Sequence, residues 1–140
     1  EADGKFEIGK ALHLVEGSDV TILATGHLVW HALEAAEELE EKGIKAEVIN
    51  IHTIKPLDDE AILNSIKKTR CVVTCEEHNY LGGLGESVSG LLAKNDPVYQ
   101  EFVATNDTFG ESGTPAQLME KYGLNTKSIV EAVNRVLAKK

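Results

Sequence analysis

The residues best placed to do chemistry follow one short apolar run of the chain. Glu76, Glu77 and His78 come directly after the predicted strand 71–75, and Gly82-Gly83-Leu84-Gly85 opens a predicted helix. In open α/β sheets, ligands collect at the carboxyl ends of the strands. The backbone N–H groups at a helix start can also hold an anion. This turn is therefore the first candidate site.

Two interpretations of the turn stay open. It is not a Gly-x-Gly-x-x-Gly motif, because position 88 is Val, and no Gly-Lys-Ser/Thr follows as in a P-loop. Two acids before the glycines would repel phosphate, whereas glycines allow a positive φ or a close backbone approach. We expect Gly83→Val to unfold the domain for that reason. The candidate residues for an interdomain or anion contact are Glu76, Glu77, His78, Gly82, Gly83 and Gly85.

Two other pairs of side chains invite a chemical interpretation that their spacing does not support. His27 and His31 lie four apart on a predicted helix, as two zinc ligands can. Position 28 is Leu, so the His-Glu-x-x-His pattern is absent, and no third ligand is apparent. Cys71 and Cys75 lie four apart on a predicted strand, about 13 Å from each other. A disulfide needs α-carbons within about 7 Å, so we expect inert core thiols.

The elements that position these residues alternate in type. Strands are expected at 11–15, 20–25, 46–51, 71–75 and within 97–104. Helices are expected at 27–42, from Asp58 or Asp59 to about 68, from the glycines to about 94, at 114–123 and from about 126. Such alternation predicts an α/β fold with a mostly parallel sheet and helices on both faces. The first strand lacks a crossover helix, so it is expected to run antiparallel.

Composition narrows the possible partners. The chain has 140 residues, which suits one domain, and a net charge of −9. This charge argues against binding nucleic acid or an anionic membrane. Two cysteines are too few for a disulfide framework, which makes a cytoplasmic location the default. The chain opens with Glu1 and shows no signal peptide, so we expect a processed product or a piece of a longer protein.

Several segments, in order across about residues 9–138, together resemble the C-terminal domain of transketolase. Related domains occur in deoxyxylulose-phosphate synthase and in the β-subunits of 2-oxo-acid dehydrogenases. The segments that carry the resemblance are Val20-Thr21-Ile22-Leu23-Ala24-Thr25-Gly26, Ile54-Lys55-Pro56-Leu57-Asp58, Glu76-Glu77-His78, Gly82-Gly83-Leu84-Gly85 and Phe109-Gly110-Glu111-Ser112-Gly113-Thr114-Pro115.

The resemblance implies a three-layer α/β/α domain at residues 9–140, with residues 1–8 as an N-terminal extension or linker. Its five-stranded mixed, mostly parallel sheet has an antiparallel first strand that pairs away from the second. A hairpin at Glu16-Gly17-Ser18-Asp19 is therefore not expected, although its turn residues would allow one.

The resemblance also implies where the chemistry lies. The resemblance implies parent enzymes of carbohydrate metabolism, in the pentose phosphate pathway, which bind thiamine diphosphate and Mg²⁺ in other domains. Their Gly-Asp-Gly and Asn-Asn elements are absent here. No catalytic, cofactor-binding or metal-binding residue is therefore assigned, and the isolated chain is expected to be inactive. The implied role is assembly or regulation, with the remaining transketolase domains or an N-terminal subunit as partner in a homodimeric enzyme. The alternative is an independent small-anion or nucleotide-binding module that uses the Gly82–Gly85 turn.

Overall fold

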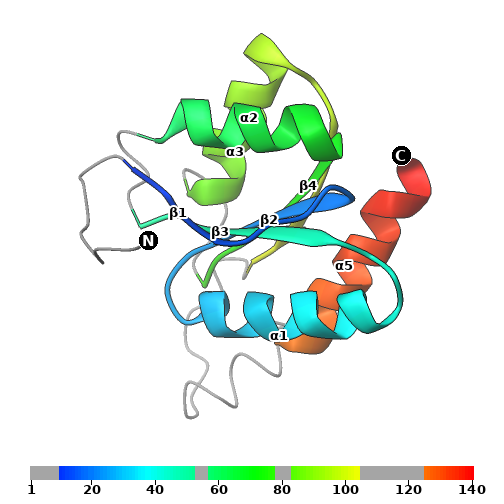
Figure 1. Cartoon of the computed structure of the whole chain (residues 1–140). Helices are drawn as coiled ribbons and strands as arrows, with labels where there is room; N and C mark the ends of the chain where they lie inside the picture. Colours follow the sequence, from blue (N-terminus) through cyan, green and yellow to red (C-terminus); the bar gives the residue numbers. More distant parts are fainter. Residues whose placement is uncertain (1–9, 53–56, 78–82, 105–124) are drawn as a thin grey trace.

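The computed structural model describes residues 10–52, 57–77, 83–104 and 125–140. These residues form one five-stranded sheet and four helices (Figure 1). The predicted helix at 114–123 and the extension at 1–8 lie outside the described residues. In chain order the elements are β1 (Leu12–Val15), β2 (Val20–Ala24), α1 (Leu28–Glu41), β3 (Ala46–Asn50), α2 (Asp59–Thr69), β4 (Cys71–Cys75), α3 (Leu84–Asn95), β5 (Tyr99–Val103) and α5 (Thr126–Lys139).

The sheet has the strand order β1-β3-β2-β4-β5. Strand β1 pairs antiparallel with β3, and every other pairing is parallel. Helices α1 and α5 cover one face of the sheet, and α2 and α3 cover the other (Figure 1). The predicted three-layer α/β/α fold and the antiparallel first strand are therefore confirmed. Because β1 pairs with β3, no hairpin joins it to β2, as expected.

The two central strands explain why the sheet sits between two helical layers. All five residues of β2 and all five of β4 are buried. Successive side chains point to opposite faces, so Ile22 enters the core under α1 and α5, while Leu23 enters the core under α2 and α3. An apolar run without polar alternation thus produces a strand that is covered on both sides.

The helix ends follow local sequence signals. Asp58 caps α2, and its Oδ1 accepts a hydrogen bond from the Ala61 N–H at 3.2 Å. Asn125 begins α5 with a capping box to Ser128. Gly43 follows α1 with φ +85°, the left-handed conformation that commonly ends a helix. These local signals set where α2 and α5 begin and where α1 ends.

Candidate functional site

The turn after β4 is built around a buried carboxylate. Glu76 is only 2% exposed. Its Oε1 accepts a hydrogen bond from the Leu84 N–H at 2.8 Å, and its Oε2 accepts one from the Gly85 N–H at 2.7 Å. The Glu76 N–H in turn donates to the Val103 carbonyl at 2.9 Å. Glu76 thus occupies the start of α3 in the way that an external anion would.

The packing of α3 against the sheet requires a glycine at position 85. A Cβ on Gly85 would meet the Phe102 ring at 2.4 Å and Thr74 Oγ1 at 3.2 Å, so the helix approaches the sheet too closely for a side chain. Gly83 has φ −97° and ψ −158°, which other residues adopt without strain. Gly83 therefore lacks the positive φ that was one reason to expect a glycine there, and a close approach to the sheet is seen at Gly85. The unfolding expected for Gly83→Val stays a prediction.

A polar clamp beneath α3 holds the same turn. The Gln100 side chain donates from Nε2 to the Gly85 carbonyl at 3.1 Å and to Thr74 Oγ1 at 3.2 Å. Ser89 Oγ donates to Gln100 Oε1 at 2.8 Å. These contacts were not predicted from the sequence, because the residues lie on three elements and follow no regular spacing along the chain. A glutamine flanked by large side chains in a short strand was the only available signal.

The end of β2 lies beside the same turn. The Thr25 N–H donates to the Cys75 carbonyl at 3.1 Å. Gly26 has φ +58°, and a Cβ there would lie 3.2 Å from Glu77 Oε1. Of the six predicted residues, Glu76, Gly83 and Gly85 meet at the start of α3, and Glu77 lies beside Gly26. His78 and Gly82 lie outside the described residues.

The two histidines lie at the start of α1 and differ in their surroundings. His27 is the exposed N-cap of α1 and makes no side-chain cap. His31 Nδ1 lies 3.0 Å from Thr126 Oγ1, which donates to Glu34 Oε1 at 2.6 Å. Among the described residues, no group of three His, Cys, Asp or Glu side chains is placed to hold a metal ion. His31 therefore connects α1 to the first turn of α5.

Both cysteines are buried free thiols in β4, as the sequence predicted. Burial raises the pKa of Cys71 and Cys75, and the charge of Glu76 raises that of Cys75 further. The thiolate is the reactive form of cysteine, so a raised pKa makes a thiol less reactive. These thiols are core side chains of β4.

A second buried carboxylate, which the sequence analysis also missed, lies near the start of β3. Glu47 is 1% exposed, and its Oε1 accepts hydrogen bonds from Lys68 Nζ at 2.6 Å and from the Gly17 N–H at 3.0 Å. His13 Nε2 lies 3.5 Å from Oε2. Burial alone would raise the pKa of Glu47, but the hydrogen bonds outweigh burial and hold it below its ordinary value.

Two open grooves lie along the helical layers. One, of about 330 Å³, runs between α1 and the β1 edge, and its lining includes Val15, Leu33 and Glu37. The other, of about 350 Å³, lies between α2 and α3 and includes Leu57, Gly90 and Lys94. Across the described segments, no helix combines the length and the apolar character that a membrane crossing requires.

Comparison with known proteins assigns this architecture to a family. Residues 9–129 match the family described as "Transketolase, C-terminal domain". That match covers most of the chain and agrees with the fold, so the chain belongs to the transketolase C-terminal domain family.

Three similar proteins show how the domain occurs elsewhere. The chain is 51% identical over 136 residues to "6-deoxy-6-sulfo-D-fructose transketolase subunit SqwH" of Clostridium sp. (strain MSTE9), covering 97% of this chain and 42% of the relative. It is 43% identical over 141 residues to "Putative transketolase C-terminal section" of Methanocaldococcus jannaschii, covering 99% and 43%. A solved structure titled "Split gene transketolase, inactive beta4 tetramer" matches with a TM-score of 0.93 and 45% identity, covering 99% and 45%. The chain thus spans less than half the length of these proteins.

Proposed function

We propose that this chain is the non-catalytic C-terminal part of a transketolase. The complete homodimeric enzyme would transfer a two-carbon ketol unit between phosphorylated sugars. Family membership supports the proposal, as do the printed names of relatives that are subunits or sections of transketolases. The chain matches less than half of each such relative, which leaves room for the catalytic domains elsewhere.

Thiamine diphosphate and Mg²⁺ would be held by those other domains. Magnesium takes carboxylate ligands, usually together with phosphate oxygens. Among the described residues, no three His, Cys, Asp or Glu side chains are grouped so that they could hold a metal ion. The N–H groups of Leu84 and Gly85, which could have met a diphosphate, already bind Glu76. No step of the ketol transfer is therefore assigned to this chain.

The role that we assign to the domain is assembly, through the turn after β4. The observation that carries this role is the pair of hydrogen bonds from the start of α3 to Glu76. An internal carboxylate ties the start of α3 to the end of β4 and satisfies donors that a small anion would need. A helix start held in place in this way loses little entropy when a protein partner docks. The same observation counts against the alternative, an anion- or nucleotide-binding module at Gly82–Gly85.

Mixing the chain with its complementary part tests the proposal. The probe is the purified polypeptide that carries the thiamine-diphosphate domains of the same enzyme. We expect a heavier complex in sedimentation and two-carbon transfer only from the mixture. His78→Ala is expected to weaken this assembly more than it lowers the melting temperature of the chain alone.

Calorimetry supplies the opposing outcome. Thiamine diphosphate with magnesium is expected to give no saturable heat with the chain alone, and inorganic phosphate is expected to give none either. Micromolar binding of the cofactor would overturn the non-catalytic assignment. Saturable phosphate binding that His78→Ala abolishes, while assembly persists, would replace the assembly role with the anion-binding module.

A further inference from the structure

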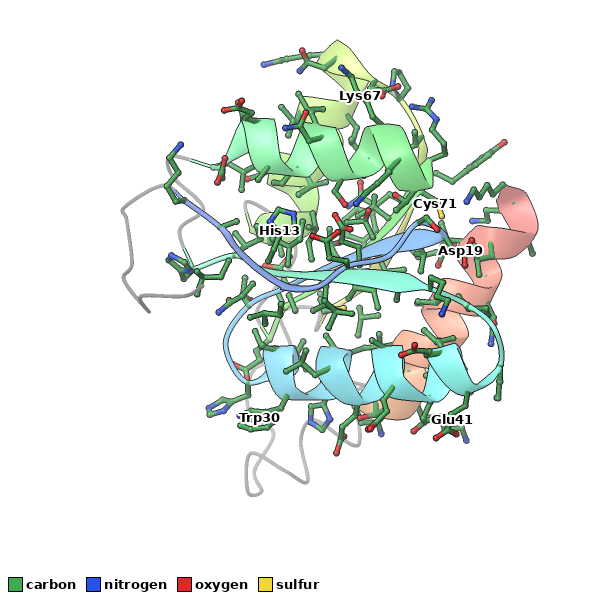
Figure 2. All side chains as sticks on the ribbon, viewed as in Figure 1. His13, Asp19, Trp30, Glu41, Lys67 and Cys71 are labelled. Carbon is green, nitrogen blue, oxygen red and sulfur yellow. The ribbon has the colours of Figure 1, made fainter. Side chains whose placement is uncertain are left out.

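The single tryptophan of the chain is unusually exposed. Trp30 lies in the first turn of α1 and is 73% exposed. In Figure 2 its side chain points away from the sheet, on the outer side of α1. Tryptophan is enriched among the residues that dominate binding energy at protein interfaces. One exposed apolar side chain needs no explanation, so the surroundings of Trp30 decide whether it marks an interface.

A groove lined by both apolar and charged side chains begins one helical turn beyond Trp30. The groove of about 330 Å³ has apolar side chains on its floor and acids on its rim. The floor residues are Val15, Leu33, Ala36 and Ala46, and the rim acids are Glu16, Glu37 and Glu40. Lys45 also lines the groove, and its Nζ lies 3.5 Å from Glu40 Oε2, so this one cation is already paired with a rim acid. The lining therefore combines apolar side chains with exposed acids that outnumber the one lysine.

The outer face of α1 carries the same sign of charge. Trp30, Glu34, Glu37 and Glu41 follow one another at spacings of four, three and four residues, which places them on one stripe of the helix. Figure 2 shows Trp30 and Glu41 at opposite ends of this face, both directed away from the sheet. We call this stripe, together with the groove beside it, the α1 surface.

Charge decides what kind of occupant fits the α1 surface. A second copy of the chain would bring acids against acids, because the chain carries a net charge of −9 and this face is acidic. Like-charge juxtaposition costs several kcal/mol at an interface. Phosphate-rich partners are repelled in the same way. A segment with Arg or Lys beside apolar side chains matches both the rim and the floor, and a guanidinium can stack on the indole of Trp30.

The α1 surface continues from the turn after β4. Helix α1 begins at Leu28, two residues after Gly26, and Gly26 lies beside Glu77. Trp30 therefore lies in the first turn of a helix that starts close to Glu77.

We propose that the α1 surface docks a segment with basic and apolar side chains from the polypeptide that completes the transketolase. This inference rests on the proposed function, and it names the surface and the chemistry of the partner segment. Trp30 provides the anchor, the groove receives apolar side chains, and the rim acids pair with the cations of the segment.

The test is the affinity of this chain for the polypeptide with the thiamine-diphosphate domains, measured by calorimetry. Trp30→Ala is expected to weaken binding about ten-fold or more, and Trp30→Phe to restore part of it. The double variant Glu37→Lys/Glu41→Lys is expected to weaken binding comparably. The matched control, Glu60→Lys/Glu131→Lys, changes net charge equally on α2 and α5 and is expected to stay within about two-fold of the original chain. Melting curves verify that each variant folds.

The outcomes separate this inference from the proposed function. If the original chain forms no complex and restores no activity, the proposed function fails. If it binds and the Trp30 and Glu37/Glu41 variants bind equally well, the partner docks elsewhere and only this inference is overturned. Equal weakening by both double variants would show a general charge effect and would also overturn it. Self-association that Trp30→Ala abolishes would assign the surface to a second copy instead.

Discussion

Glu76 and Glu47 are both buried carboxylates, yet they lie near opposite ends of the parallel strands and are stabilised differently. Glu76 follows β4 at the carboxyl edge and accepts hydrogen bonds from two backbone N–H groups of α3. Glu47 lies near the start of β3 and accepts one hydrogen bond from a lysine and one from a backbone N–H. The first arrangement ties the start of α3 to the end of β4, whereas the second neutralises a charge that the fold has buried.

The two carboxylates differ in how much the stability of the domain depends on them. Burial of an unpaired charge is costly, so both need partners. Glu47 has the half-exposed Lys68, which water can partly replace. Glu76 has backbone groups that face away from water, and these groups would lose their acceptor if Glu76 were removed. We therefore expect the loss of Glu76, at the carboxyl ends of the strands, to destabilise the domain more than the loss of the partner of Glu47 at their amino ends.

The largest effect is expected for Glu76→Ala. This change leaves the N–H groups of Leu84 and Gly85 without an acceptor at a buried position. Each hydrogen bond to a charged group contributes about 1.5–3 kcal/mol, so the free energy of unfolding should fall by roughly 3 kcal/mol or more. Urea unfolding measures it. Glu76→Gln keeps one acceptor and should lose less, and a loss below about 0.5 kcal/mol for Glu76→Ala would contradict the account.

Two glycines of α3 should respond in opposite directions. Gly85→Ala places a Cβ against Phe102 and Thr74, and overpacking of this kind costs about 1–3 kcal/mol. Gly90→Ala meets nothing within 4 Å and should stabilise the domain by about 0.5–1 kcal/mol, because alanine favours a helix interior. Paired melting curves compare them. Equal behaviour of the two variants would mean that α3 does not approach the sheet closely at the turn.

A smaller loss is expected for Lys68→Met. It removes the cation that pairs with Glu47, but Lys68 is 45% exposed and Glu47 keeps its hydrogen bond from Gly17. We expect a loss of about 1–2 kcal/mol, less than the roughly 3–5 kcal/mol for breaking a fully buried pair. Lys67→Met is the matched control, since the exposed Lys67 precedes it on the same helix. The pairing would be refuted if both variants lost the same stability.

The smallest expected effect is a change in acid sensitivity. The pKa of Glu47 is lower in the folded chain than its ordinary value, because hydrogen bonds outweigh burial. Its contribution to stability is therefore present above the ordinary carboxyl pKa and is lost as pH falls through the folded pKa. The pKa of Glu101 is lowered in the same sense, since hydrogen bonds from Lys139 and Arg135 outweigh its burial.

Lys68→Met should reduce the loss of stability at acid pH that comes from Glu47 and leave the loss that comes from Glu101 unchanged. The free energies of unfolding of the original chain and the Lys68→Met variant, measured from neutral to acid pH, test this. Parallel curves would show that Lys68 does not hold the Glu47 pKa down.

How far the sequence predicts the structure depends on the distance between interacting residues. The apolar runs of β2 and β4 and the cap at Asp58 are local, and the structure confirms them. The resemblance supplied the strand pairing of β1. The partners of the two buried acids escaped prediction, because Glu47 and Lys68 lie 21 residues apart and Glu76 meets Gly85 across a turn. The sequence also could not show what the glycine at position 85 packs against, because its neighbours Phe102 and Thr74 come from strands β5 and β4.

The most direct measurement of the central claim follows the backbone amide signals of Leu84 and Gly85 by nuclear magnetic resonance. We expect millimolar inorganic phosphate to leave both signals in place, because Glu76 already accepts hydrogen bonds from these N–H groups. Adding the polypeptide with the thiamine-diphosphate domains should shift or broaden both signals, because the turn forms part of the contact. Saturable shifts with phosphate, together with no response to that polypeptide, would contradict the account.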